Sequence, residues 1–133
     1  MGASEDQTAS GRVLVVEDDP LQRRAVVRLL HLWGYDAVEA ADGGAALDRY
    51  REIHDQLDAM LLDIMLPVLN GVDVAREVSA SDPELPIIAC SAAFDESIES
   101  ELRDLGVSDF LRKPYDAESL HATLARQITR DEG

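Results

Sequence analysis

Short apolar runs alternate with stretches of helical periodicity along most of the chain. Apolar residues recur every three or four positions in five stretches, which predicts five amphipathic helices with one buried stripe each. The stripes are Leu21, Ala25, Leu29 and Leu32; Ala46, Tyr50 and Ile53; Val74, Ala75 and Val78; Ile98, Leu102 and Leu105; and Leu120, Leu124 and Ile128. Five shorter runs, several rich in β-branched residues, have the length and composition of strands. They lie at residues 13–16, 35–38, 59–62, 87–90 and 110–111.

Helix start and stop signals fall where these stripes begin and end. Four aspartates stand at N-cap positions, where a carboxylate accepts backbone N–H groups: Asp19, Asp42, Asp95 and Asp116. Pro20 would occupy a first helical position, and Gly34 and Gly106 follow two stripes as C-cap glycines do. Asn70-Gly71 in isolation would predict a hairpin turn, but helical rather than strand periodicity follows it, so we reject the hairpin.

Strand and helix patterns alternate, which predicts an α/β protein of five βα units. Near-continuous apolar strands indicate a parallel sheet that is buried on both faces and covered by helices on both sides. We therefore expect a doubly wound (βα)5 domain with a five-stranded parallel sheet. Residues 11–130 would form this single domain, between a flexible polar tail at residues 1–10 and a polar end at residues 131–133.

Charge and cysteine content narrow the functional classes. With 27 acidic and 12 basic residues, the formal net charge of the 133-residue chain is -15. A field of this sign repels nucleic acid and anionic membranes, and it suits cations or basic partners. No apolar run is long enough to cross a bilayer. Cys90 is the only cysteine, so no internal disulfide can form, which fits a reducing, cytoplasmic location.

Chemically active side chains follow four of the five predicted strands. Ligands of open α/β sheets bind beyond the carboxyl ends of the strands, so we expect these groups to converge. They are Glu17, Asp18 and Asp19 after the first strand, Asp63 after the third, Ser91 after the fourth, and Arg112, Lys113 and Pro114 after the fifth. Converging carboxylates repel one another, and a divalent cation such as Mg²⁺, which prefers oxygen ligands, would relieve that repulsion.

A hydroxyl and an ammonium group beside such a cluster favour an anion that arrives with the cation. Phosphoryl fits best, because Mg²⁺ and Lys113 would neutralise its oxygens while Ser91 donates a hydrogen bond. A central carboxylate could then act as nucleophile and form an acyl phosphate. Taken singly, each residue also has a structural interpretation: a helix N-cap for the first acids, a turn residue for Asp63, and a solvated charge for Lys113. Their joint placement favours a site.

Four segments together resemble the receiver domain of two-component response regulators, of the chemotaxis-regulator type. They are residues 13–20 (VLVVEDDP), 61–71 (LLDIMLPVLNG), 86–92 (PIIACSA) and 109–114 (DFLRKP), and the resemblance extends from about residue 12 to 128. It implies a flavodoxin-like three-layer sandwich. Each motif alone is weak, but the four in this order are highly specific.

The resemblance implies a role for each acidic residue of the site. Asp63 would be the phosphorylation site. Asp18 and Asp63 would bind Mg²⁺, with Mn²⁺ as an alternative, through their side chains, and Met65 through its backbone carbonyl. Glu17 stands where aspartate is also common, and its longer side chain would act through a water molecule on the metal.

Three further residues would take part in the switch. Ser91 and Lys113 would bind the phosphoryl group, and the Lys113–Pro114 peptide bond would be cis, as in the family. The ring of Phe110 would turn into the space that Ser91 vacates. These movements would remodel the face formed by the fourth helical stripe, the fifth strand and the fifth stripe.

The implied function is that of a phospho-accepting switch. A histidine kinase or a histidine phosphotransfer protein would supply the phosphoryl group, and a downstream protein target, not identified by the sequence, would read the result. The chain would not be an enzyme beyond slow self-dephosphorylation. A polar side chain two residues after Asp63 or Ser91 could orient an attacking water, but these positions hold Met65 and Ala93, which cannot do so well.

Three other classes remain to be weighed. An aspartate-nucleophile phosphatase would carry a second aspartate two residues after Asp63, where this chain has Met65. A flavodoxin-like cofactor binder needs a phosphate-binding loop after the first strand, and Glu17 and Asp18 would repel that phosphate. A phosphorylation-independent scaffold of receiver type would have lost the acceptor, an acid or the lysine, all of which are present.

Overall fold

The computed structural model describes residues 11–66 and 69–128. The predicted tail at residues 1–10 and the predicted polar end at residues 131–133 lie outside these ranges. The strands are β1 (Arg12–Val16), β2 (Asp36–Ala40), β3 (Ala59–Asp63), β4 (Ile87–Ser91) and β5 (Asp109–Arg112). The helices are α2 (Pro20–Leu32), α3 (Gly43–Ile53), the 3₁₀ turn η1 (His54–Gln56), α4 (Gly71–Ser81), α5 (Glu96–Asp104) and α6 (Ala117–Ile128).

All strand pairs are parallel, and the strand order is β2-β1-β3-β4-β5. The predicted five-stranded parallel sheet is therefore confirmed. The chain passes from β1 outward to β2 and then returns to the other side of β1 to form β3. This reversal creates a switch point between the carboxyl ends of β1 and β3, where open α/β sheets place their ligands.

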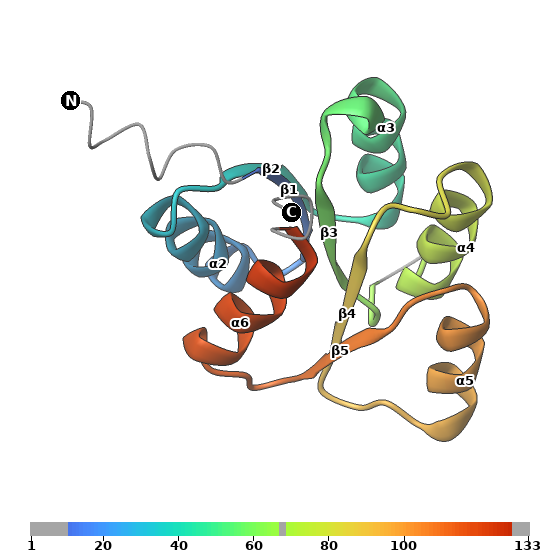
Figure 1. Ribbon diagram of the computed structural model, residues 1–133. Coiled ribbons are helices and arrows are strands. Elements are labelled where there is room, and N and C mark those ends of the chain that lie inside the picture. Colours follow the sequence, from blue (N-terminus) through green and yellow to red (C-terminus); the bar gives the residue numbers. More distant parts are fainter. Residues whose placement is uncertain (1–10, 67–68, 129–133) are drawn as a thin grey trace.

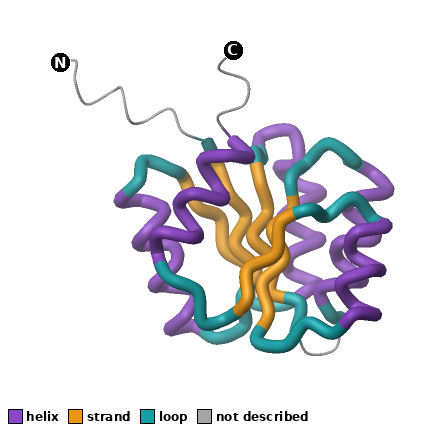
Figure 2. Tube along the Cα trace, turned by 60° about the horizontal axis from the view of Figure 1, so that its bottom comes forward, coloured by secondary structure: helices purple, strands orange, loops and turns teal. Residues whose placement is uncertain are grey.

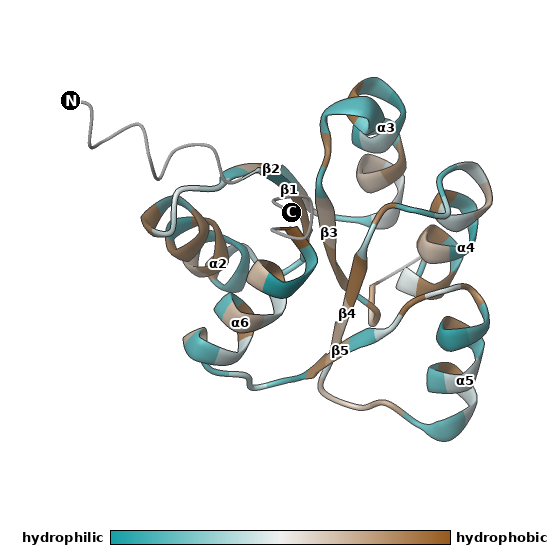
Figure 3. Ribbon diagram, in the orientation of Figure 1, coloured by the Kyte–Doolittle hydropathy of each residue, from teal (hydrophilic) through white to brown (hydrophobic). Residues whose placement is uncertain are grey.

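The sheet is the middle of three layers, with α2 and α6 on one face and α3, α4 and α5 on the other (Figures 1 and 2). Alternate residues of β1 show the separation: Val13 and Val15 belong to the core under α2 and α6, whereas Leu14 and Val16 belong to the core under the other three helices. This period-two alternation follows from strand geometry. The predicted doubly wound arrangement is confirmed, and β3 and β4 are hydrophobic along most of their length in Figure 3.

Helix ends agree with the predicted caps. Side chains of the four predicted aspartates accept hydrogen bonds from backbone N–H groups of the first turn: Asp19 from Leu21 at 2.9 Å, Asp42 from Ala45 at 2.8 Å, Asp95 from Ile98 at 2.7 Å and Asp116 from Ser119 at 2.7 Å. Asn70 caps α4 in the same way, which explains why Asn70-Gly71 opens a helix instead of a hairpin.

Within the described residues, no helix combines the length and the hydrophobicity needed to span a membrane.

The second strand begins and ends later than predicted. It was expected at residues 35–38, but β2 runs from Asp36 to Ala40. Tyr35 is buried, yet its backbone N–H donates to the carbonyl of Leu30 at 2.9 Å and so completes the end of α2. Gly34 reaches a φ of 92° at this helix end, a conformation that glycine adopts without strain. Tyr35 therefore supplies core area without joining the sheet.

The predicted buried face of α2 is wrong. Leu21 and Leu32 of the expected stripe are 72% and 76% exposed, and the buried positions are Val26 and Leu30. Apolar residues occur around much of this helix, so two neighbouring faces both show apolar residues every three or four positions, and the sequence pattern alone does not distinguish them. The exposed stripe of α2 consists of Leu21, Ala25 and Leu32, whereas Leu29 is half-buried and packs against the core under α2 and α6.

Gly71 lets α4 begin directly beside the loop that follows Asp63. Its N–H donates to the carbonyl of Ile64 at 3.0 Å. A Cβ atom at this position would lie 2.5 Å from the Ile64 Cα and 2.7 Å from the Asp63 carbonyl oxygen. Both neighbours are backbone atoms, so neither can move without displacing the end of β3.

Gly71→Ala is therefore expected to lower the free energy of unfolding by about 2 kcal/mol, because the added methyl group overpacks a rigid contact. Urea denaturation measures the change. Gly44→Ala is the matched control: the nearest heavy atom to its Cβ is the Asp42 side-chain oxygen at 3.4 Å. That variant should be unchanged or more stable by up to about 1 kcal/mol. Equal stability of the two variants would contradict the steric argument.

Candidate functional site

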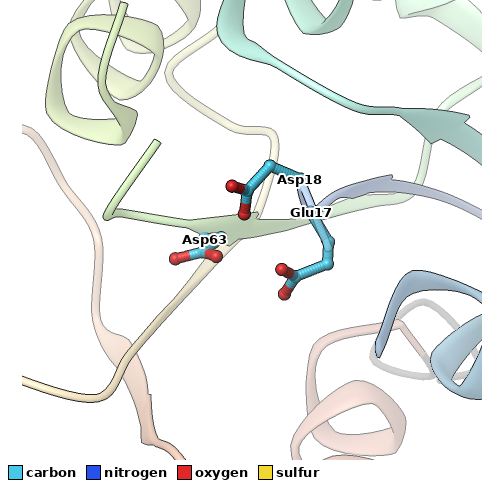
Figure 4. Close-up of side chains that lie close together, drawn as sticks. All are labelled: Glu17, Asp18 and Asp63. Carbon is cyan, nitrogen blue, oxygen red and sulfur yellow. The ribbon is translucent and has the colours of Figure 1, made fainter. Parts of the chain in front are cut away.

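Three carboxylates meet at the switch point. Glu17 and Asp18 follow β1, Asp63 ends β3, and the two strands are neighbours in the sheet. Each residue offers a carboxylate oxygen within 4.8 Å of those of the other two. Figure 4 shows the three side chains gathered at this edge. Glu17 and Asp63 are only 7% and 5% exposed, whereas Asp18 is exposed.

The trio of Glu17, Asp18 and Asp63 fits a divalent cation. Oxygens on opposite sides of Mg²⁺ lie about 4.2 Å apart, twice the usual Mg–O distance. Adjacent oxygens lie closer, about 3 Å apart, so the three carboxylate oxygens, which lie within 4.8 Å of one another, must draw together to share one ion, and Asp18 is exposed and can move. An all-oxygen ligand set of this kind favours Mg²⁺ over softer metals.

Lys113 is the counter-charge of this cluster. Its Nζ donates to Glu17 Oε1 at 2.7 Å, to Gln22 Oε1 at 3.0 Å and to Asp63 Oδ2 at 3.1 Å. Its backbone N–H donates to the Ser91 carbonyl at 2.8 Å, and the Lys113–Pro114 peptide bond is cis. Burial alone would lower the pKa of Lys113, but the hydrogen bonds to Glu17 and Asp63 outweigh it and raise that pKa. The ammonium group therefore stays charged.

Glu17 is a buried acid held from several sides. Burial raises its pKa, and hydrogen bonds from Lys113 and from the Asp19 N–H partly oppose the rise. The Asp19 N–H donates to Glu17 Oε2 at 3.1 Å. Arg23 secures the same loop, because its Nη1 donates to the Glu17 carbonyl at 2.8 Å while its Nε pairs with Glu39 at 2.9 Å.

Both oxygens of Asp63 are engaged. Oδ2 accepts from Lys113, and Oδ1 accepts the Met65 N–H at 3.0 Å. This second bond fixes the carboxylate and the start of the following loop relative to each other. Met65 itself is 58% exposed. The metal contact through its carbonyl oxygen stays a prediction.

Ser91 and Phe110 lie on neighbouring strands, in local contacts. The buried Ser91 hydroxyl donates to the Ala93 carbonyl at 3.0 Å and accepts the Ala93 N–H at 3.1 Å. The half-buried ring of Phe110 meets the ring of Phe94 edge-on at 5.5 Å, and the Arg103 guanidinium lies 4.7 Å from its centroid. The movement of Ser91 towards a phosphoryl group, and the turn of the Phe110 ring into the space that Ser91 vacates, stay predictions.

Sequence reasoning missed Gln22 and Tyr115. Gln22 accepts a hydrogen bond from Lys113, which lies 91 residues later in the sequence, and no sequence motif predicts this contact. Tyr115 follows the Lys-Pro motif, and its side chain packs near buried Cys90 behind the carboxylates; burial raises the pKa of both groups. Cys90 is a core residue, as expected.

An apolar pocket of about 500 Å³ opens beside the charged groups. Ala25, Val26 and Leu29 of α2 form one wall, and Pro114 and Tyr115 form the other. Glu17, Gln22 and Lys113 lie among its lining residues, so the pocket leads from the exposed stripe of α2 to the polar site. A partner that seats apolar side chains here would come close to Lys113.

The chemistry of these groups defines a class. Three carboxylates can hold a divalent cation, and one ammonium group beside them can bind an anion that the cation also attracts. The protein is thus a doubly wound α/β protein whose switch point brings three carboxylates and one ammonium group together.

The family model described as "Response regulator receiver domain" matches residues 13–125. The chain therefore belongs to the receiver domain family of two-component response regulators. Members of this family are generally not enzymes.

Sequence relatives agree. The chain is 38% identical over 125 residues to the response regulator MprA of Mycolicibacterium vanbaalenii, which covers 92% of this chain and 53% of that protein. The chain thus spans about half the length of the MprA relatives it matches.

Solved structures agree as well. Chemotaxis protein CheY4 of Vibrio cholerae has a TM-score of 0.83 at 28% identity, covering 90% of this chain and 100% of that one. The receiver domain of sensor histidine kinase PA1611 from Pseudomonas aeruginosa has a TM-score of 0.77 at 32% identity, covering 90% of this chain and 98% of that one. That receiver carries a magnesium ion coordinated in its active-site cleft.

Lys113→Met is expected to destabilise the metal-free protein by about 2 kcal/mol, because it leaves the buried carboxylates of Glu17 and Asp63 without their counter-charge. The loss should shrink as the pH falls through the raised pKa of Glu17, since protonation removes one of the repelling charges. Urea denaturation in EDTA at several pH values measures it.

Mg²⁺ should restore part of this stability, because it binds the folded trio and not the unfolded chain. Arg49→Met is the control: its ion pair with Glu52, at 3.0 Å, is exposed and should contribute less than about 0.5 kcal/mol. A Lys113→Met protein as stable in EDTA as the control would refute the charge-balance argument.

Proposed function

We propose that this chain is a phospho-accepting switch in which Asp63 receives a phosphoryl group with the help of Mg²⁺. The observation that carries the proposal is the contact of Lys113 Nζ with Asp63 Oδ2 at 3.1 Å, next to two further carboxylates. A nucleophilic carboxylate, a cation site and an ammonium group are together what phosphoryl transfer to aspartate requires. The PA1611 receiver, with magnesium in its cleft, supports the choice of metal.

Transfer would exchange one bond to phosphorus for another. An oxygen of Asp63 attacks the phosphorus of a phosphohistidine, the N–P bond breaks, and the imidazole leaves with the bonding electron pair and takes up a proton. Asp18 and Asp63, with Glu17 through a water molecule, would hold Mg²⁺, which would supply positive charge to the phosphoryl oxygens. Lys113 moves a hydrogen bond from a carboxylate to a phosphoryl oxygen and so stabilises the charge that develops there.

The acyl phosphate then shifts an equilibrium between two conformations of Ser91 and Phe110. Its oxygens compete with the Ala93 carbonyl for the Ser91 hydroxyl, and Ser91 turning towards them leaves space beside β4 for the Phe110 ring. Arg103 and Phe94 hold that ring in its present place. The surface around α5 and β5 would therefore differ between the two states, and a downstream protein would distinguish them. The cytoplasm is the compartment we propose for these reactions, because Cys90 is the single cysteine of the sequence and forms no internal disulfide.

The first test is phosphorylation of the purified chain. Incubation with acetyl phosphate and Mg²⁺ should add the mass of one phosphoryl group, and EDTA or Asp63→Asn should abolish the addition. Intact-mass spectrometry separates a phosphoryl from an acetyl adduct. A phosphoryl adduct that survives in Asp63→Asn would overturn the assignment. Absence of any adduct, with Mg²⁺ still bound, would favour the scaffold alternative.

The phosphoryl group should be long-lived. Met65 and Ala93 lie two residues after Asp63 and Ser91, and neither orients an attacking water well, because alanine has no hydrogen-bonding group and a thioether is only a weak acceptor. Decay of the adduct after removal of acetyl phosphate, followed by mass, should take much longer than seconds. Met65→Gln should shorten it, because an amide would be introduced at that position. Loss of the wild-type adduct within seconds would count against this prediction and in favour of phosphatase-like turnover.

The phosphodonor would dock on α2. Exposed Leu21 lies one helical turn before Ala25, and Ala25 and half-buried Leu29 line the pocket that also contains Lys113. A bulky donor needs such an apolar surface beside Asp63. Acetyl phosphate needs none.

Leu21→Ser should therefore slow phosphotransfer from a histidine kinase or phosphotransfer protein by about tenfold. Labelling by acetyl phosphate should change by less than about twofold, since the site itself is intact. Leu32→Ser, at the far end of the exposed stripe, should have a smaller effect. Radiolabel transfer measures the rates, and equal slowing with both donors would argue against docking on α2.

A further inference from the structure

Gln22 joins α2 to the charged site through one side chain. Its Oε1 accepts a hydrogen bond from Lys113 Nζ at 3.0 Å. Its Nε2 donates to Asp19 Oδ2 at 3.1 Å, and its backbone N–H donates to Asp19 Oδ1 at 3.3 Å. The Asp19 carboxylate thus orients the amide, because the nitrogen faces the cap and the oxygen faces the lysine.

The three acceptors around Lys113 differ in kind. An ammonium group has three N–H donors, and Glu17, Asp63 and Gln22 each take one. Glu17 and Asp63 belong to the carboxylate trio, which a divalent cation would engage. Gln22 is neutral and lies outside the trio.

We propose that Gln22 is a positioning residue that keeps Lys113 directed at Asp63 when a divalent cation engages the carboxylates. A bound cation weakens the hold of Glu17 and Asp63 on the lysine, because it competes for their oxygens and repels the ammonium charge. The amide of Gln22 carries no net charge, so its hydrogen bond survives that competition. Lys113 can then exchange its bond to Asp63 for a bond to a phosphoryl oxygen without leaving the site.

The hydrogen bond between Gln22 and Lys113 also connects donor docking on α2 with the phosphorylation site; this step rests on the proposed function. Gln22 lines the apolar pocket together with Ala25 and Leu29. A donor seated on that surface would exclude water from the bond between Gln22 and Lys113, and hydrogen bonds strengthen in such surroundings. Docking on α2 would thereby steady the lysine at the moment of transfer.

One feature of the sequence makes the proposal directly testable. Lys113 is the only lysine in the chain, so an amine-directed reagent can modify only this side chain and the N-terminal amine. The rate at which acetic anhydride modifies Lys113, followed by peptide mass spectrometry, reports how firmly its ammonium group is held. This readout needs neither phosphorylation nor a partner.

In Gln22→Leu, Lys113 should be modified about fivefold faster when Mg²⁺ is present, because its neutral acceptor is gone. The dissociation constant for beryllofluoride, an analogue of the phosphoryl group, should rise by about fivefold in Mg²⁺, while Mg²⁺ affinity itself stays unchanged. The matched control is Gln56→Leu, which removes another exposed glutamine that accepts from a cation, Arg12 Nη1 at 2.5 Å.

The outcomes separate this inference from the proposed function. If Gln22→Leu matches Gln56→Leu and the wild type in both measurements, or if modification speeds up without loss of beryllofluoride affinity, the positioning role is wrong. If the wild type binds no beryllofluoride with Mg²⁺, the proposed function fails. The modification rates of wild type and Gln22→Leu in Mg²⁺ then still decide whether Gln22 holds the lysine.

Discussion

The balance between one ammonium group and three carboxylates is the interaction on which the rest of this site depends. Glu17 and Asp63 are buried at the ends of adjacent strands, where their charges repel and water is scarce. Lys113 reaches both from β5, at the far edge of the sheet, and its pKa rises accordingly. A site that carries excess negative charge and a single movable cation responds to any incoming charge. Receiver domains use such a site for signalling.

The fold brings these charges together through its strand order. Because β3 pairs with β1 instead of β2, the carboxyl ends that carry Asp63 and Glu17 lie side by side. The tight start of α4 at Gly71 and the hydrogen bond from Met65 to Asp63 then restrict the loop that follows. Strand pairing and the tight packing at Gly71 thus determine where the carboxylates lie, although neither supplies a polar side chain to the site.

Much of the architecture and the polar site could be predicted because both follow local rules. Strand length, helical period and capping residues determine the element order, and strand ends of a parallel sheet share one edge. The buried side of α2 could not be predicted, since Val26 and Leu30 compete with an equally periodic stripe that contains Leu21. The start of β2 was misplaced because Tyr35 ends a helix with its backbone and fills the core with its side chain. Gln22 was missed because its contact depends on side-chain geometry between distant segments.

The three layers also affect the order in which other molecules can bind. The pocket beside α2 lies on one face of the sheet, and Phe110, with Phe94 and α5, packs against the opposite face. If the proposed donor contact lies on the first face and the proposed target contact on the second, the two contact surfaces do not overlap, and release of one partner need not precede arrival of the other. Signal relay could then proceed through a ternary complex, with its speed set by the domain's internal rearrangement and not by the exchange of partners on a shared surface.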